Sequence, residues 1–284
     1  MRKNIIGFNT KIGRNKPETI INKDASCPFC EYKHIEHIIA TCGEMTLLEN
    51  KYNVLEHSFQ TVLLETRYCG SDMPDYSHKH MHDLIHFGVD HWFSMLDSGK
   101  YKSVLFFKNY GPLSGGTMRH PHMQIIGLED IDNDSLYDES DFFGMSIIKK
   151  GAVEFNVSTS PRLGFCELNI LTENNSELDT MADFIQISVD YIMKHFDNRC
   201  KSYNIFFYRI KGLIKVKIMP RFPTSPLFIG YNLRLRPNNL DIIIAEIRKI
   251  YFFFFFCRSN ISCFFAFLSL PFGYPLFFFF PLHF

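Results

Sequence analysis

The arrangement of apolar and polar positions changes along the chain, and these changes predict its secondary structure. Over residues 78–96 and 178–196, apolar side chains recur at the spacing of one helical face. A further helix is expected over 239–251. Short runs rich in β-branched and aromatic residues predict strands at 45–48, 59–65, 103–108, 120–127, 153–157, 164–171, 203–208 and 213–219. Residues 129–140 are acidic and are predicted to form a loop.

The predicted elements occur in the same order twice. In each half, strands are followed by a helix and then by two more strands, which indicates an internal duplication. Such an order favours antiparallel sheet with helices packed on one side, an α+β fold. We expect a first unit at 1–140, a second unit at 141–250 and an aromatic tail at 251–284.

The tail has an unusual composition. The chain contains 31 Phe among 284 residues, and many of them lie beyond residue 251, in runs such as 252–256 and 277–280. These runs are typical of low-complexity sequence, and a slipped reading frame is the favoured interpretation. Membrane insertion comes second, because 261–284 reaches the ~20 apolar residues of a span but is interrupted by three prolines. A packed core segment comes third.

Charge and cysteine usage narrow the function classes. The 30 basic and 30 acidic side chains cancel, which argues against a general nucleic-acid binder. Residues 1–8 contain no apolar run of signal-peptide length, so a cytoplasmic protein is expected, with thiols or metal ligands rather than disulfides. Cys27 and Cys30 have the spacing of a zinc site or a redox pair. The polar stretch before them favours metal, because a redox pair is expected to open a helix after a strand.

A glycine-bearing loop followed by two histidines carries the strongest chemical signal. Gly115 and Gly116 allow backbone N–H groups to approach a phosphate closely. His120 and His122 are two residues apart on a predicted strand and therefore share a face, as does Gln124. An imidazole beside such a loop can attack phosphorus, and an amide can hydrogen-bond the oxygens on which charge develops. The simpler interpretation is a pair of histidines on a half-buried strand.

These residues also carry a family resemblance. Phe107-x-Asn109-x-Gly111 with His120-Pro121-His122-x-Gln124 resembles the galactose-1-phosphate uridylyltransferase branch of the histidine-triad (HIT) superfamily. It resembles a bacterial, DUF4931-like subgroup of that branch more closely. The resemblance covers roughly residues 10–250 and includes the segments 27–30, 50–52 and 228–231, although Asn53 stands where the family has proline. It implies a HIT-like fold and suggests a homodimer.

The resemblance implies roles for individual residues. His122 corresponds to the family's nucleophile, and Gln124 to the residue that steadies the transferred phosphoryl group. Contacts with nucleotide or phosphate are implied or expected for a further set: Asn50, Asn109, Gly115, Gly116 and Thr117. Arg119 adds a cation beside the loop, where it can stabilise phosphoryl charge or pair with the acidic loop at 129–132.

A structural zinc ion is also implied. In the family, the two cysteines and the first histidine of His-Pro-His are ligands, here Cys27, Cys30 and His120. The remaining family ligand is a histidine shortly after a Glu-Thr strand end, where this chain has Cys69. A Cys₃His set suits tetrahedral Zn²⁺ and leaves no open position. His78 is the rival for Cys69 and is disfavoured.

Two other polar patterns leave alternatives open. His82 and His86 are four residues apart on a predicted helix, a spacing that can bind metal but without a further ligand more often marks a solvated face. In the second unit, Lys215-Val216-Lys217 stands where the duplication predicts His-x-His. No metal site is therefore expected in that half. These lysines are interpreted either as exposed strand positions or, for Lys217 or Arg221, as facing a substrate phosphate.

The leading functional interpretation is a nucleotidyltransferase that forms a covalent nucleotidyl-histidine. It would move a nucleoside monophosphate from a nucleotide-sugar or dinucleoside-type donor to a phosphorylated acceptor, as a hexose-1-phosphate uridylyltransferase does. A hydrolase or phosphorylase with the same site is the first alternative. A non-catalytic, zinc-stabilised nucleotide-binding protein and a redox protein using Cys27 and Cys30 are the others. A nucleic-acid partner is not expected, and a membrane partner only if the tail inserts.

Overall fold

The computed structural model describes residues 5–132, 137–163 and 165–253, so the predicted tail from residue 254 onward lies outside the described residues. The chain divides into two compact units, one up to Ile244 and one from Ala245. The helix α5 (Leu240–Tyr251) begins in the first unit and continues into the second. Within the described ranges, every helix is too short or too polar to cross a bilayer.

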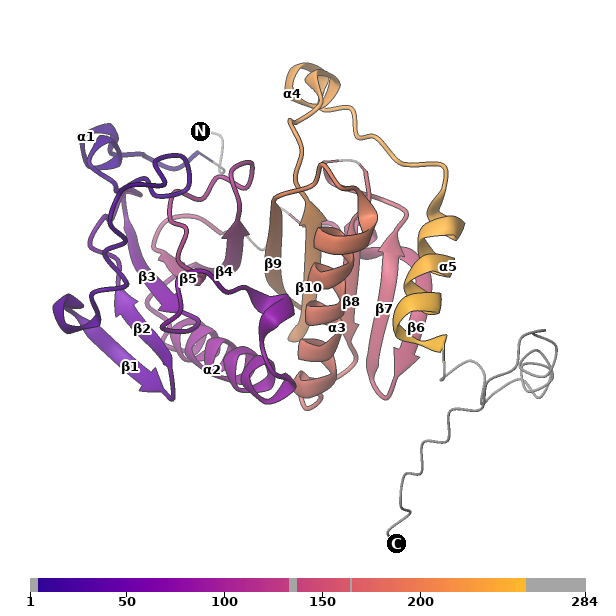
Figure 1. Cartoon of the computed structure of the whole chain (residues 1–284), viewed down its shortest axis with the longest axis horizontal. Helices are drawn as coiled ribbons and strands as arrows, with labels where there is room; N and C mark the ends of the chain where they lie inside the picture. Colours follow the sequence, from indigo (N-terminus) through magenta and orange to yellow (C-terminus); the bar gives the residue numbers. More distant parts are fainter. Residues whose placement is uncertain (1–4, 133–136, 164, 254–284) are drawn as a thin grey trace, which may run out of the picture. The chain divides into compact units, whose positions relative to one another are not determined.

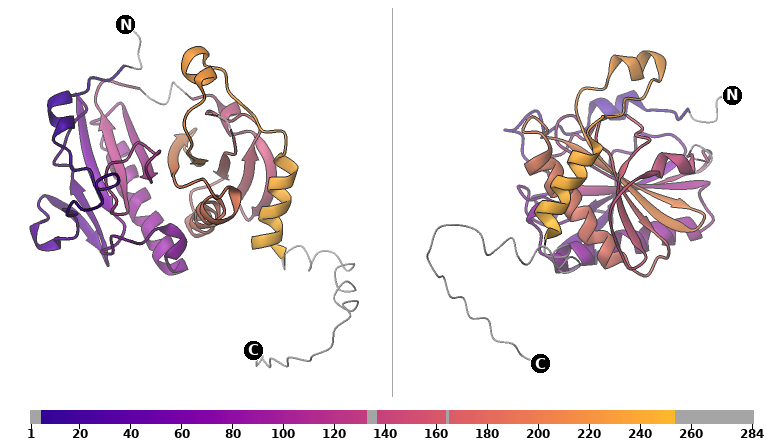
Figure 2. Two further views of the ribbon diagram at one scale, coloured as in Figure 1. Left: turned by 45° about the horizontal axis from the view of Figure 1, so that its top comes forward. Right: turned by 90° about the vertical axis from the view of Figure 1, so that its right-hand side faces the viewer.

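Ten strands form one antiparallel sheet with the order β1-β2-β3-β5-β4-β9-β10-β8-β7-β6. The first five are β1 (Ile38–Cys42), β2 (Met45–Glu49), β3 (Ser58–Leu64), β4 (Ser103–Tyr110) and β5 (His122–Leu128). The second five are β6 (Gly144–Lys150), β7 (Val153–Ser158), β8 (Leu168–Thr172), β9 (Tyr203–Ile210) and β10 (Leu213–Pro220). Each half has the same internal order, and β4 meets β9 at the centre (Figure 1). Figure 2 shows the strands and helices of both halves from two further sides. The predicted duplication is confirmed.

One long helix follows the third strand of each half. These helices, α2 (His78–Asp97) and α3 (Leu178–Tyr191), lie on the same face of the sheet and contact each other (Figure 1). The last turn of α3 continues as a π-helical segment, Ile192–Phe196. Two short helices, α1 (Thr10–Arg14) and α4 (Pro226–Tyr231), and three 3₁₀ turns, Tyr32–His34, Met73–Asp75 and Glu139–Phe142, complete the described elements of this unit. The predicted α+β class is confirmed.

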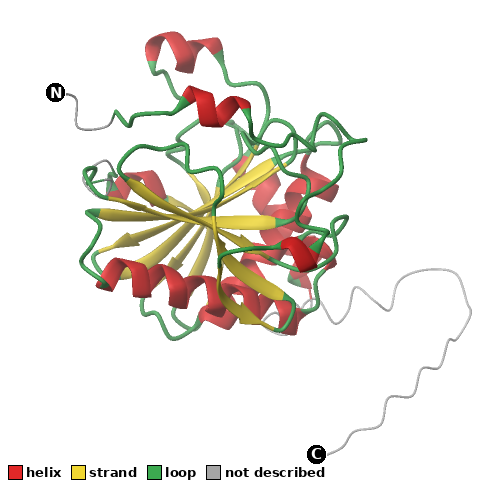
Figure 3. Cartoon of the chain, turned by 90° about the vertical axis from the view of Figure 1, so that its left-hand side faces the viewer, coloured by secondary structure: helices red, strands yellow, loops and turns green. Residues whose placement is uncertain are grey.

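Aromatic packing joins the helices to the sheet and the two halves to each other. Trp92 on α2 packs on Phe106 of β4 with ring centroids 5.8 Å apart, and Phe106 stacks on Phe207 of β9 at 4.3 Å. In the second half, Phe184 of α3 stacks on Phe155 of β7. Large rings buried in offset contacts stabilise a core by apolar area and by ring–ring attraction. Figure 3 shows the strands fanning across one another, the twist expected of a single sheet.

The central pairing sets the symmetry of the sheet. Phe107 on β4 pairs with Phe206 on β9. Phe107 also pairs with Gln124 of β5, and Phe206 pairs with Lys217 of β10. Lys217 is therefore the counterpart of Gln124, and Lys215, two residues earlier, is the counterpart of His122. The predicted unit boundaries at residues 140 and 250 stay predictions.

Candidate active site and metal cluster

His122 stands at the first position of β5, where its backbone pairs with Leu64 of β3. Its Nδ1 lies 2.7 Å from the carbonyl oxygen of His120. A carbonyl oxygen only accepts, so this hydrogen bond assigns the proton to Nδ1 and leaves the lone pair on Nε2. Burial lowers the pKa of His122 to about 4. The imidazole is therefore neutral at neutral pH, which is the form that can act as a nucleophile.

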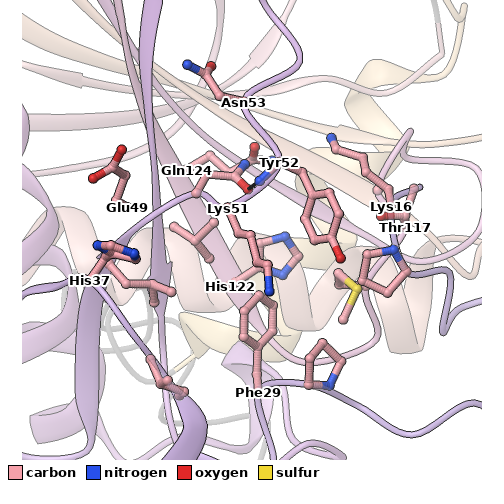
Figure 4. Close-up of a pocket in the computed structure, with 18 of the residues that line it drawn as sticks. Lys16, Phe29, His37, Glu49, Lys51, Tyr52, Asn53, Thr117, His122 and Gln124 are labelled. Atoms are coloured by element: carbon pink, nitrogen blue, oxygen red, sulfur yellow. Dashed lines mark hydrogen bonds between the residues drawn. The ribbon is translucent and has the colours of Figure 1, made fainter. Parts of the chain in front are cut away.

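A cavity of about 480 Å³ opens beside His122 (Figure 4). Six of the residues predicted from the sequence line it, namely Asn50, Gly115, Gly116, Thr117, His122 and Gln124. The structure thus brings the β2–β3 connection to the glycine loop and the start of β5, whose cavity residues follow those of the connection by more than 60 residues in the sequence.

The glycine loop between β4 and β5 is tightly held. Gly111 has φ +83°, and a side chain there would clash with the carbonyl oxygen of Lys201, so both its conformation and its surroundings require glycine. Gly115 has φ +87°. The hydroxyl of Ser114 donates to the Gly111 carbonyl at 2.7 Å and accepts from the Gly116 N–H at 3.2 Å. These bonds keep the loop in one shape at the edge of the cavity.

Beside the predicted residues Asn50 and Thr117, the cavity is lined by further side chains that were not predicted as ligand contacts. The Asn50 side chain accepts from the N–H of Tyr52 at 2.9 Å, a local turn that turns Lys51 and Tyr52 toward the cavity. Lys16 reaches the cavity from the N-terminal segment, which is fixed by the bond from the Thr19 N–H to the Thr117 carbonyl. Figure 4 shows both lysines among the residues around His122. Burial lowers the pKa of Lys16.

The sequence pattern gave no direct signal for Lys16. It is a single lysine in a segment without a motif, and only tertiary pairing with the glycine loop brings it to the site. Lys51 and Tyr52 could be found through the family resemblance of residues 50–52. Two ammonium groups beside a neutral imidazole can offset the charge of a polyphosphate.

Two other predicted contacts lie differently. The Asn109 side-chain oxygen accepts from the amide of Asn204 at 2.6 Å, which ties the base of the glycine loop to β9. The Arg119 guanidinium donates to the Lys23 carbonyl at 3.1 Å, and the neighbouring thiol of Cys69 raises the pKa of Arg119. Both residues thus make contacts within the frame of the site, and their contacts with a ligand stay predictions.

Beside the cavity, four potential metal ligands converge: Cys27, Cys30, Cys69 and His120. Their ligand atoms all lie within 4.8 Å of one another. His120 Nδ1 is 3.8 Å from Cys27 Sγ and 3.9 Å from Cys30 Sγ. His120 Nε2 donates to the Thr66 carbonyl at 2.9 Å, so the lone pair on Nδ1 points at the thiols. The cluster can therefore hold a metal ion.

The protonation of the cluster depends on a cation. Burial raises the pKa of Cys27, and burial with the neighbouring thiols raises that of Cys30 to about 12. Thiols in such surroundings give up their protons readily only when a cation compensates the thiolate charge. Cys27 and Cys30 are free thiols in the structure. Cys69 completes this cluster, whereas His78 lies beside Asp183 on another part of the surface.

The lysines of β10 correct the sequence interpretation. Lys217 is fully buried, with Nζ 3.0 Å from Glu167 and 2.8 Å from the side-chain oxygen of Asn169. Lys215 is also buried, and Phe142 lies beneath both ammonium groups. The prediction that these lysines are exposed was wrong, and so was the alternative that Lys217 faces a substrate phosphate. The turn Glu139–Phe142 packs against this face of the second half and encloses both side chains.

A buried ionic group supports the site from the helix-covered face. Lys108 on β4 contacts the carboxylates of Glu65 and, at 3.1 Å, of Asp72. The hydroxyl of Tyr203 donates to Asp72 at 2.7 Å, and that of Tyr76 donates to Glu65 at 3.0 Å. Burial disfavours the ammonium form, but the two carboxylates outweigh it and raise the pKa of Lys108. A lone lysine within an apolar strand was the sequence signal for this group.

Comparison with known proteins gives two adjoining family matches. The model of the DUF4931 N-terminal domain, a domain of unknown function, matches residues 8–131, and that of the DUF4931 C-terminal domain matches residues 133–252. The crystal structure of a DUF4931 family protein from Bacillus cereus is 36% identical, with a TM-score of 0.70. The match covers 76% of this chain and 99% of that one.

More distant structures share the fold. An ADP-glucose phosphorylase from Arabidopsis thaliana, solved with ADP-glucose, is 14% identical with a TM-score of 0.67, over 86% of this chain and 95% of that one. A GalT-like protein from the same plant is 15% identical with a TM-score of 0.65, over 79% and 91%. The predicted HIT-like fold of the galactose-1-phosphate uridylyltransferase type is confirmed.

A curated relative has a different description. A Lactobacillus helveticus protein described as a di-/tripeptide transporter is 25% identical over 199 residues, which are 69% of this chain. The matched part is 37% of that protein, so this chain spans less than two fifths of its length.

Proposed function

Because this chain belongs to the DUF4931 family and shares the fold of galactose-1-phosphate uridylyltransferase-like proteins, we propose that it is a nucleotidyltransferase with a covalent nucleotidyl-histidine intermediate. The observation that carries the proposal is the state of His122. Its imidazole is neutral, its Nδ1 is held by the His120 carbonyl, and it lines a cavity beside a glycine loop. Its Nε2 lone pair is thereby left for attack on phosphorus.

The proposed reaction has two displacements. In the first, His122 Nε2 attacks the α-phosphorus of a nucleotide-sugar or dinucleoside donor, and the bond from that phosphorus to the bridging oxygen breaks. The sugar phosphate, or the remaining nucleoside phosphate of a dinucleoside donor, leaves with the bonding electrons, and the nucleotidyl group stays on Nε2. In the second, a phosphate oxygen of the acceptor attacks the same phosphorus and the P–N bond breaks, which restores His122.

The neighbouring residues have defined parts in this proposal. Gln124 hydrogen-bonds the non-bridging oxygens while charge develops on them. Lys16 and Lys51, which line the same cavity, offset the charge of the phosphates. Phe29 packs against the imidazoles of His120 and His122 and keeps this wall of the cavity apolar.

We also propose that Cys27, Cys30, Cys69 and His120 hold a structural zinc ion. The sulfur and nitrogen donors suit Zn²⁺, and four protein ligands leave no position for substrate. Bound zinc would stabilise the fold and fix the ring of His120. The backbone carbonyl of the same residue accepts the Nδ1 proton of His122, so holding His120 also orients the nucleophile.

The covalent intermediate is directly testable. The full-length protein is incubated with α-³²P-labelled UDP-glucose, ADP-glucose and diadenosine tetraphosphate in separate reactions and then quenched. We expect a labelled protein adduct that is acid-labile and base-stable with at least one donor. His122→Asn should abolish it, whereas His91→Asn, on α2, should retain it. No adduct with any donor from a zinc-loaded, folded protein would overturn the mechanism.

The same adduct separates the alternatives. A transferase discharges it to a sugar phosphate, a hydrolase to water and a phosphorylase to orthophosphate, so the labelled product identifies the acceptor. A nucleotide-binding protein without turnover would bind donor and form no adduct. The cytoplasmic location and the homodimer stay predictions, and size-exclusion chromatography with light scattering tests the latter.

A further inference from the structure

A second group of metal-ligating side chains lies far from the cysteine cluster in the sequence. His78, His82 and His86 stand on successive turns of α2 and face Asp179 and Asp183 on α3. The two helices lie side by side on one face of the sheet (Figure 1). The sequence spacing alone left this histidine row without a further ligand, and the neighbouring helix supplies one.

We propose that His78, His82 and Asp183 form a second site for a divalent transition-metal ion such as Zn²⁺ or Co²⁺. The ligand atoms of these three residues lie within 4.8 Å of one another. His82 Nε2 is 2.8 Å and His78 Nδ1 is 3.3 Å from the same oxygen, Oδ1 of Asp183. Ligands at ~2.1 Å from a tetrahedral ion are ~3.4 Å apart, so small side-chain rotations suffice to admit the ion.

The surroundings of His82 favour a cation at its Nε2. Its other nitrogen, Nδ1, faces Oδ1 of Asp179 at 3.6 Å, so carboxylates flank the ring on both sides. A neutral imidazole has one N–H and can satisfy one of them, and its second nitrogen then presents a lone pair to an anion. An ion shared with Asp183 uses that lone pair as a ligand. Nδ1–H is then left to donate to Asp179, the carboxylate–histidine–metal arrangement common at metal sites.

The charges nearby are compatible with this assignment. Lys150 Nζ lies 3.8 Å from Oδ2 of Asp183, so it faces the oxygen that the histidines do not contact. Lys79, between His78 and His82 in the sequence of α2, forms an ion pair with Asp83, with its Nζ 2.6 Å from Oδ2. Asp179 also accepts from or pairs with His86 Nε2 at 2.9 Å. Asp179 and Asp183 of α3 are therefore both directed at the histidine row.

The two helices are also held in place independently of any ion. Ser77 caps α2 by accepting from the His80 N–H at 3.2 Å. Gln186, one turn after Asp183, donates to the carbonyls of Met73 at 2.9 Å and Tyr76 at 2.8 Å, just before α2 begins. The ligands therefore project from a fixed frame, which reduces the ordering that metal binding requires.

An ion here would cross-link the two halves of the duplicated fold, because α2 belongs to the first half and α3 to the second. An ion that binds only the folded protein stabilises it by mass action. The site is thus expected to couple metal concentration to the stability of the helix pair, without any part in the proposed phosphorus chemistry.

The test uses the full chain without a polyhistidine tag, with zinc already bound at the cysteine cluster. Calorimetric titration with Co²⁺ should show one additional ion per chain, with visible d–d absorption and no new thiolate charge-transfer band. The thermal midpoint should rise with Co²⁺ concentration. His82→Gln and Asp183→Asn should each weaken binding by about tenfold or more, as loss of a ligand does.

A matched control is available on another surface. His57 also lies beside two carboxylates, with Nδ1 3.3 Å from Asp130 and 4.0 Å from Glu129. His57→Gln should leave Co²⁺ binding unchanged. The proposal is overturned if no additional ion binds, if neither ligand variant weakens binding, or if His57→Gln weakens it equally. Absence of metal binding would mean that the row is held by its contacts with Asp179 and Asp183 alone.

Discussion

Replacing Lys108 with methionine should destabilise the protein severely, because it leaves two carboxylates buried without their cation. Lys108 and Glu65 have fully buried side chains, and that of Asp72 is 8% exposed. Removing one partner of a buried ion pair costs ~3–5 kcal/mol, a large part of the ~5–15 kcal/mol that stabilises a typical domain. We therefore expect Lys108→Met to lose ~4 kcal/mol of unfolding free energy at neutral pH.

Urea unfolding followed by tryptophan fluorescence measures this loss, because Trp92 is the single tryptophan and packs on Phe106, two residues from Lys108. Lys149→Met is the matched control: its partner Glu173 is mostly exposed, so the loss should stay below ~1 kcal/mol. A second change, Glu65→Gln, should restore part of the stability of Lys108→Met, since it removes one uncompensated charge.

The stabilisation contributed by Lys108 should depend on pH in a defined direction. The pKa of Lys108 is raised in the folded protein, so its stabilising effect is complete below the unfolded value of ~10.4 and is lost as pH rises through the folded value. The difference between wild type and Lys108→Met should thus shrink above pH ~10.4. Burial also raises the pKa of Glu65, so the difference should shrink toward acidic pH as well, where this carboxylate takes up a proton in the variant. A neutral-pH loss no greater than that of Lys149→Met would refute the account of the buried group.

Three further outcomes are expected. Gly111→Ala should cost about 3 kcal/mol in urea unfolding, and Gly99→Ala about 1 kcal/mol, because both have positive φ but only the former also clashes with backbone. Cys69→Ala should lose the ion of the cysteine cluster during dialysis, measured by the thiolate charge-transfer band of the Co²⁺-substituted protein, whereas His78→Ala keeps that band; the reverse would exclude Cys69 as a ligand. Lys51→Ala should raise the KM for the donor about tenfold with a smaller effect on kcat, and an unchanged KM would contradict its phosphate contact.

Elements with a strong one-sided apolar pattern were predictable from the sequence. The helix expected at 78–96 is α2 (His78–Asp97), because a repeated apolar stripe packs on the sheet. The edge strands β1 (Ile38–Cys42) and β6 (Gly144–Lys150) were missed. Both lie at the ends of the sheet, where a strand buries few side chains and leaves little alternation in its sequence.

The site was predictable where chemistry is encoded by short spacing. The pattern 120–124 predicted two imidazoles and an amide on one strand, and the structure puts His122 and Gln124 in one cavity. β5 begins only at His122, so His120 lies before the strand and joins the cysteines instead. The positions of Lys16 and Lys217 could not be predicted from the sequence. Only long-range packing brings Lys16 to the cavity and encloses Lys217. The prediction of the zinc ligands depended on the family resemblance for Cys69 and His120, whereas the spacing of Cys27 and Cys30 indicated a metal site directly.

The symmetry of the sheet bears on labelling stoichiometry. The counterpart positions of His122 and Gln124 in the second half hold Lys215 and Lys217, and Lys217 is neutralised by Glu167. A duplicated fold that began with two equivalent reaction centres would therefore retain one. Exhaustive reaction with labelled donor should therefore saturate at one nucleotide per polypeptide.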